Sequence, residues 1–126
     1  MSKQTVAVVG LGRVGTAFLE ELMCVVDKGI KIAYAVEQND TPGRKMALDY
    51  HIPVVTLDGL IAEGEKVDVI FDLTGSEAVR KELRSKLYAS DNKHTVIAPE
   101  SIARMVWALM ADDSKALPDA HGRKGY

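Results

Sequence analysis

The stretch Val6-Ala7-Val8-Val9-Gly10-Leu11-Gly12-Arg13-Val14-Gly15 decides the fold of this chain. A short apolar, β-branched run ends in a glycine loop (residues 10–15), and a helical pattern begins at once. Gly10 permits a tight turn, Gly12 lets the backbone approach a phosphate, and Gly15 lets the helix pack closely on the strand. The amides of residues 11–14 then lie at a helix N-terminus, which favours an anion. This order predicts a site for the pyrophosphate of a dinucleotide.

The composition is that of one globular domain and excludes several classes of protein. The chain has 126 residues, 47% of them hydrophobic and 27% charged, with a net charge of −2. This charge gives no reason to expect a nucleic acid or an anionic membrane as a partner. No apolar run reaches the ~18 residues that span a bilayer, and we expect no signal peptide before the first strand. The single cysteine, Cys24, suits a reducing compartment, so we expect a cytoplasmic protein.

Strand and helix patterns alternate along the chain, which predicts an α/β fold with a parallel sheet. Five strands are expected, at residues 5–9, 30–36, 52–55, 67–73 and 95–98. The helices are expected at residues 13–26, about 42–50, 58–62, after Ser76, and 102–111. Right-handed crossovers give the strand order 3-2-1-4-5, with helices on both faces. We expect a domain over residues 1–111 and a tail, mobile or strapped over the surface, over residues 112–126.

The second predicted strand ends at Glu37, about 20 positions after Gly15, and Gln38 follows it. A carboxylate at this point is the expected partner of the adenosine ribose hydroxyls, and it repels a 2′-phosphate. We therefore predict that Glu37 and Gln38 contact the cofactor and that NAD(H) is preferred to NADP(H). Arg13 and Arg44 leave the alternative open, because either could bind a 2′-phosphate. Surface charge and packing along the helix are their other interpretations.

Two further loops follow the fourth and fifth predicted strands. Thr74 and Gly75 are expected beside the nicotinamide ribose, or else form a plain turn before the Ser76 cap. Pro99 is expected on the same nicotinamide side. Asp72 is interpreted as a structural residue that holds loop amides, and Glu100 as a carboxylate at a helix start.

These motifs resemble a known family. The glycine loop, Glu37, and the segments 67–75 and 94–99 are similar to the NAD(P)-binding Rossmann domains that begin homoserine dehydrogenases, aspartate dehydrogenases and the glucose-fructose oxidoreductase group. The resemblance covers about residues 5–111 and implies a doubly wound Rossmann fold that holds a nicotinamide dinucleotide. Those enzymes place their catalytic residues in a following substrate domain. The resemblance therefore assigns no catalytic residue to this chain.

The histidines and the cysteine give no catalytic or metal site. His51 and His94 precede strands, so we expect them at the edge of the sheet opposite the ligand, and His121 falls in the tail. No Cys, His, Asp or Glu spacing indicates a metal site. Cys24 is expected to pack within the first helix.

The last predicted helix is apolar on two sides. Ile102, Met105, Val106 and Leu109 make one face, and much of another is made by Ala103, Trp107, Met110 and Ala111. One face can cover the sheet, and the other predicts a partner, either a second copy of this chain or a separate subunit. The alternative is that the tail folds back over it through Leu117 and Pro118.

Three functional hypotheses follow. The first is a stand-alone domain that binds a nicotinamide dinucleotide and senses or holds it. The second is an oxidoreductase related to the homoserine or aspartate dehydrogenases, whose substrate domain is missing or lies on another chain. The third is an interaction module with an empty crevice, which the three glycines of the loop make less favourable.

Overall fold

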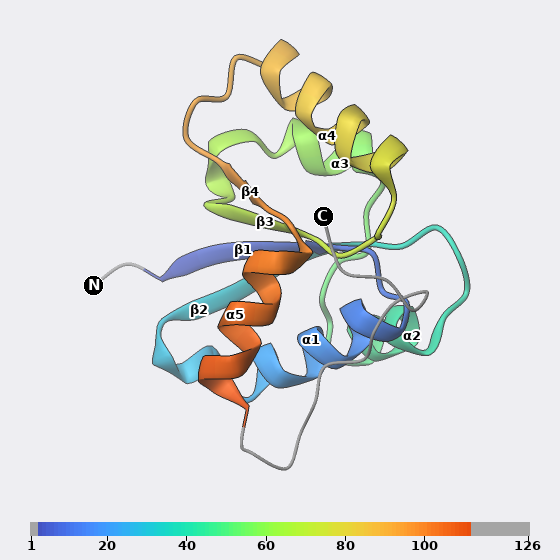
Figure 1. Cartoon of the computed structure of the whole chain (residues 1–126), viewed down its shortest axis with the longest axis vertical. Helices are drawn as coiled ribbons and strands as arrows, with labels where there is room; N and C mark the ends of the chain where they lie inside the picture. The colour runs from blue at the N-terminus through green and yellow to red at the C-terminus, as the bar shows by residue number, and fades with distance from the viewer. Residues whose placement is uncertain (1–2, 112–126) are drawn as a thin grey trace.

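A parallel sheet forms the middle layer of the molecule (Figure 1). The computed structural model describes residues 3–111 of the chain. The sheet has four strands in the order β2-β1-β3-β4. They are β1 (Gln4–Val9), β2 (Ile30–Val36), β3 (Val69–Asp72) and β4 (Val96–Ala98). All neighbouring strands run parallel, as the sequence predicts.

The third predicted strand, residues 52–55, is reduced to a single bridge, so the expected count of five strands is wrong. Val54 bridges Ala35 of β2 in parallel, and two backbone hydrogen bonds of 3.0 and 2.9 Å flank the bridge. Pro53 has no N–H group, and Thr56 already caps the next helix, so the pairing cannot lengthen in either direction. The segment nevertheless lies beside β2, where the predicted order places it.

Helices cover both faces of the sheet (Figure 1). One face is covered by α1 (Arg13–Met23), α2 (Pro42–Asp49) and α5 (Glu100–Met110). The other is covered by α3 (Leu57–Ala62) and α4 (Glu77–Ala89). Two short 3₁₀ helices, η1 (Val26–Lys28) and η2 (Gly64–Lys66), lead into β2 and β3. No helix within residues 3–111 is long and apolar enough to cross a membrane.

The first helix is shorter than predicted, and this changes the environment of Cys24. Helix α1 ends at Met23, and Cys24 is its C-cap residue rather than part of its buried face. The thiol is exposed and lies 3.5 Å from the main-chain oxygen of Glu20. The prediction that Cys24 packs inside the helix is therefore wrong.

The side chains of β1 divide the core into two parts, one on each face of the sheet. Val6 and Val8 belong to the cluster beneath α1, α2 and α5, where the rings of Phe18 and Phe71 lie 4.8 Å apart. Ala7 and Val9 belong to the smaller cluster beneath α3 and α4. This two-residue alternation buries β1 on both sides, as a central parallel strand requires.

A hydrogen-bonded cluster ties the amino ends of three strands together. The Asp68 carboxylate accepts a hydrogen bond from the Thr5 amide at 2.8 Å and lies 2.6 Å from Nε2 of His94. The bond from the Thr5 amide and the contact with His94 lower the pKa of Asp68 below its ordinary value. His94 thus lies at the edge opposite the glycine loop, as predicted.

Candidate functional site

The loops that follow β1, β2 and β3 meet at the carboxyl edge of the sheet. The Gly10 amide donates to Val36 at the end of β2 over 2.8 Å, and the Leu73 amide donates to Val9 over 2.8 Å. A Cβ atom on Gly10 would lie only 2.9 Å from the Thr74 nitrogen, and Gly10 has a φ of +96°. The structure therefore brings the glycine loop together with the Thr74 and Glu37 loops.

The other two glycines of the loop have different surroundings. A Cβ on Gly15 would lie 1.8 Å from the Gly10 carbonyl oxygen, so only glycine lets α1 lie this close to the loop. A Cβ on Gly12 would meet no described atom within 4 Å. Gly15 thus serves helix packing, and Gly12 leaves open space above the backbone, as the motif predicts for a phosphate.

The N-terminus of α1 differs from three other helix starts in the molecule. Helices α2, α3 and α4 are capped by the side chains of Thr41, Thr56 and Ser76. The N-cap of α1 is Gly12, and within residues 3–111 this helix has no side-chain cap and no acidic residue in its first turn. Its first amides and the positive end of its dipole are oriented to receive an anion.

The Leu11 amide is the exception among the amides predicted to face the pyrophosphate. It donates to Oε1 of Glu37 over 2.7 Å, so this N–H group is already satisfied inside the protein. Among the amides predicted to face the pyrophosphate, that of Leu11 is thus bound within the protein, and the prediction that it contacts the cofactor stays a prediction. The physical reason is that β1 and β2 are neighbours, so a carboxylate at the end of β2 reaches the loop that follows β1.

Glu37 joins the glycine loop to the loop after β2. Its second oxygen, Oε2, accepts a hydrogen bond from the Asn39 amide over 3.0 Å. Arg44 of α2 donates from Nε to the main-chain oxygen of Glu37 over 3.2 Å, which places the guanidinium group beside the same loop. Gln38 is exposed next to it. The carboxylate is fixed at the adenosine end of the predicted site.

The Thr74 loop is held by Asp72, which is fully buried. One carboxylate oxygen of Asp72 accepts from the Thr74 amide at 3.2 Å and from its hydroxyl at 2.8 Å. The Thr74 hydroxyl in turn accepts from the Ser76 amide at 3.1 Å. Gly75, with a φ of +65°, completes the turn. The structural role predicted for Asp72 is confirmed.

Pro99 and Glu100 lie at the end of β4, two strands from β1. Pro99 is the N-cap of α5, and Glu100 is buried with 1% of its surface exposed. Oε2 of Glu100 accepts a hydrogen bond from Nε of Arg104 over 3.2 Å. The charge of the buried Glu100 carboxylate is thus compensated by a cation of its own helix. Among the predicted contacts with the cofactor, Pro99 lies farthest from Glu37 in the sheet.

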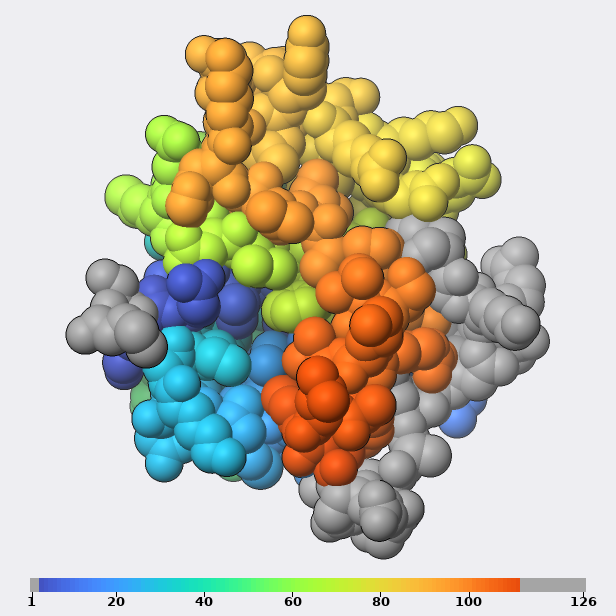
Figure 2. Space-filling view, turned by 60° about the vertical axis from the view of Figure 1, so that its left-hand side comes forward, coloured from blue at the N-terminus to red at the C-terminus, as the bar shows by residue number. Residues whose placement is uncertain are grey.

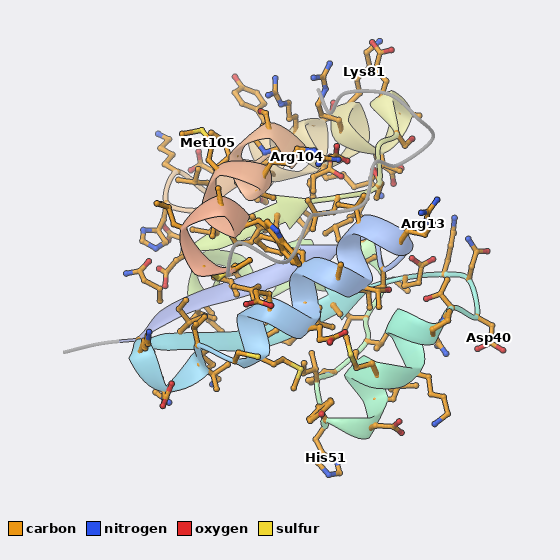
Figure 3. The ribbon with its side chains drawn as sticks, turned by 60° about the horizontal axis from the view of Figure 1, so that its bottom comes forward. Arg13, Asp40, His51, Lys81, Arg104 and Met105 are labelled. Carbon is orange, nitrogen blue, oxygen red and sulfur yellow. The ribbon has the colours of Figure 1, made fainter. Side chains whose placement is uncertain are left out.

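Figure 3 shows which of the labelled side chains lie near the start of α1 and which lie away from it. Arg13 and Asp40 lie at the same end, where α1 begins and the β2–α2 loop turns, and Arg13 points outward. His51 follows the other end of α2. The histidines of the described chain therefore lie away from the glycine loop, and no group of three or more metal-ligating side chains occurs within residues 3–111.

Gly43 and Thr16 contribute to this part of the structure, although the sequence pattern assigns neither of them to the site. A Cβ on Gly43 would lie 2.1 Å from Oγ1 of Thr16 and 2.9 Å from the Leu11 oxygen. The Thr16 hydroxyl donates to that same oxygen over 3.1 Å. In the sequence, this contact could have been found only from a glycine inside a helical pattern, since such a glycine often marks close packing.

Comparisons with known proteins identify the fold. No family model and no curated protein matches the chain. A homoserine dehydrogenase from Thiobacillus denitrificans is 24% identical, with a TM-score of 0.58 over 77% of this chain and 23% of its own. A homoserine dehydrogenase from S. aureus is 16% identical, with a TM-score of 0.58 over 78% of this chain and 26% of its own.

A third solved structure, GenD2 from gentamicin A biosynthesis in complex with NAD, is 19% identical, with a TM-score of 0.50. It is matched over 78% of this chain and 34% of its own. The chain thus spans only about a quarter to a third of the length of these structures. The likenesses, together with the strand order and the glycine loop, show that this chain has a Rossmann-like fold.

Proposed function

We propose that this chain binds a nicotinamide dinucleotide across the carboxyl edge of its sheet and senses or holds it. The observation behind the proposal is the uncapped N-terminus of α1 at Gly12, next to a fixed Glu37 carboxylate. The first element suits a pyrophosphate and the second suits a ribose with two free hydroxyls. The solved relative with bound NAD supports the same ligand class by analogy of fold.

We further propose that NAD(H) is preferred to NADP(H). The Glu37 carboxylate would lie beside the 2′ position and repel a phosphate there. Arg44 favours the opposite outcome, since its guanidinium group is held on the Glu37 carbonyl. We expect the carboxylate to dominate, because the amides of Leu11 in the glycine loop and of Asn39 in the loop after β2 hold it in place.

Calorimetric titration with NAD, NADH, NADP and NADPH tests both proposals. Wild-type protein should bind the NAD pair more tightly, and Glu37→Ala should weaken NADH binding by about 10-fold, the value of one charge-assisted hydrogen bond. Glu65→Ala, which removes an exposed carboxylate before β3, should leave binding unchanged. Absence of binding at millimolar ligand would overturn the function, and preference for NADPH would overturn the role of Glu37.

An oxidoreductase of the homoserine dehydrogenase type is the second candidate, and the fold likeness favours it. Hydride transfer needs a proton donor or acceptor near the nicotinamide. In the described chain, the carboxylates at the ends of β3 and β4 accept hydrogen bonds within the protein. Asp72 accepts one from the Thr74 hydroxyl, and Glu100 accepts one from Arg104. These two carboxylates therefore serve the fold, and this candidate needs a proton donor or acceptor elsewhere.

The exposed face of α5 is proposed as the contact between two copies of this chain. Ala103 and Trp107 face the core, whereas Ile102, Met105 and Leu109 are exposed. Figure 2 shows α5 at the molecular surface. Strand β4 forms the edge of the sheet beside it among the described residues, and an open edge also favours pairing. The tail that could cover this face lies outside the described residues.

Light scattering over a range of concentrations tests the association. Wild-type protein should be dimeric at high micromolar concentration, and Leu109→Lys should be monomeric, because a charge replaces a side chain that is 88% exposed. Tyr88→Lys is the matched control, since Tyr88 on α4 is also 88% exposed. A wild-type monomer at every concentration, or a dimer that Leu109→Lys leaves intact, would contradict the proposal.

A further inference from the structure

Leu11 is held through both of its main-chain polar groups, which belong to the two peptide groups on either side of it. Its N–H group donates to Oε1 of Glu37 over 2.7 Å, and its oxygen accepts from the Thr16 hydroxyl over 3.1 Å. Leu11 itself is fully buried, so neither of these peptide groups can rotate toward solvent without disturbing the packing of its side chain. The Gly10–Leu11 peptide is therefore held by Glu37, and the Leu11–Gly12 peptide by Thr16.

The Thr16 bond is not an ordinary contact within a helix. A helical threonine returns its hydroxyl to the carbonyl three or four residues earlier. Thr16 reaches five residues back, to a residue outside α1, while its amide makes the first helical bond to Gly12 over 2.9 Å. Its hydroxyl therefore anchors the glycine loop onto the helix that follows it.

Gly43 brings α2 against the same anchor. Its backbone is ordinary helix, so the glycine is required by contact rather than by conformation. The space for its Cβ is already filled by Thr16 Oγ1 and the Leu11 oxygen, at 2.1 and 2.9 Å. The next residue, Arg44, bonds to the Glu37 carbonyl. The start of α2, the Glu37 loop and the glycine loop thus form one interlocked unit.

We propose that Thr16 and Gly43 are positioning residues of the dinucleotide site. They fix the Leu11–Gly12 peptide and the start of α2, and so hold Glu37 and Gly12 in the arrangement that an adenosine ribose and its pyrophosphate would need. Neither residue needs to touch the ligand. This inference rests on the proposed function, because it concerns how that site is preorganised.

Calorimetry with NADH, ADP-ribose and nicotinamide mononucleotide tests the inference on the full chain. Thr16→Val keeps the side-chain shape and removes the hydroxyl, whereas Thr16→Ser keeps the hydroxyl. We expect Thr16→Val to weaken NADH and ADP-ribose binding equally, by about 5- to 10-fold. Thr16→Ser should restore wild-type affinity, and nicotinamide mononucleotide should be unaffected. Amide hydrogen exchange at Leu11 should be faster in Thr16→Val than in the wild type or in Thr16→Ser.

Gly43→Ala provides an independent test, with Gly59→Ala as its control. Gly59 is also a helical glycine, but its Cβ would meet nothing closer than 3.2 Å. Gly43→Ala should weaken ADP-ribose binding by about 10-fold or more, and Gly59→Ala should not. If Gly43→Ala fails to fold, the comparison of Thr16→Val with Thr16→Ser still tests the proposal.

The possible failures are distinguishable. Wild-type protein that binds neither NADH nor ADP-ribose would overturn the proposed function itself. Wild-type protein that binds both, with Thr16→Val equally tight, would overturn only the positioning role. A Thr16→Val variant that is less stable but binds with wild-type affinity would show a merely structural hydroxyl, and would overturn it as well.

Discussion

Replacing Gly15 with alanine should lower the free energy of unfolding by about 3 kcal/mol. In an ordinary helix this change would stabilise the protein by up to about 1 kcal/mol. Here the new Cβ would lie 1.8 Å from the Gly10 carbonyl oxygen, a backbone atom that no side-chain rotation can move. Helix α1 must shift away from β1, which loosens the packing of Phe18 and Leu22 in the larger core cluster.

Urea unfolding followed by the fluorescence of Trp107 measures this loss, since the single tryptophan lies on the buried face of α5. Gly12→Ala is the control within the same loop, because its Cβ would meet no described atom within 4 Å. It should cost less than about 1 kcal/mol. Equal stability of the Gly15→Ala variant and the wild type would contradict the close packing of loop and helix.

Gly12→Val should weaken NADH binding by about 100-fold or more and leave the fold intact. The isopropyl group would occupy the open space above the loop and hold the pyrophosphate away from the first amides of α1. Loss of one or two charge-assisted hydrogen bonds corresponds to this factor. The backbone of Gly12 is extended, with a φ of −79° and a ψ of −151°, so valine needs no positive φ at this position.

Titration and unfolding must be measured on the same preparation of Gly12→Val. Its unfolding midpoint in urea should remain close to that of the wild type, and Gly12→Ala should give an intermediate loss of affinity. A Gly12→Val variant that binds NADH as tightly as the wild type would place the pyrophosphate elsewhere.

The features that sequence reasoning predicted best depend on local chemistry. The apolar run of β1, the three glycines and the helical period after Arg13 are contained within one continuous segment. The cap residue Ser76 acts on an amide three residues ahead, so its role could also be predicted directly. The strand order followed from the right-handedness of crossovers, a rule that holds for nearly all parallel sheets.

The features that could not be predicted depend on contacts between distant segments. Gly43 is required by Thr16 and Leu11, which the alternation of elements alone does not bring together. The pairing of Glu37 with the Leu11 amide needs the exact separation of two strand ends. The early end of α1, which exposes Cys24, and the single bridge at Val54 reflect competition at element ends, where helix and strand boundaries are least determined by sequence.

The exposed position of Cys24 makes the chain suitable for site-specific labelling. It is the only cysteine in the sequence, and it caps the end of α1 remote from the glycine loop. The 11 residues of α1 separate the two ends by about 16 Å at the usual rise per residue. A maleimide dye attached there would leave the loop untouched, while the rigid helix between them couples the dye to any movement at Gly12. Occupancy of the site could then be followed optically at protein concentrations far below those that calorimetry needs.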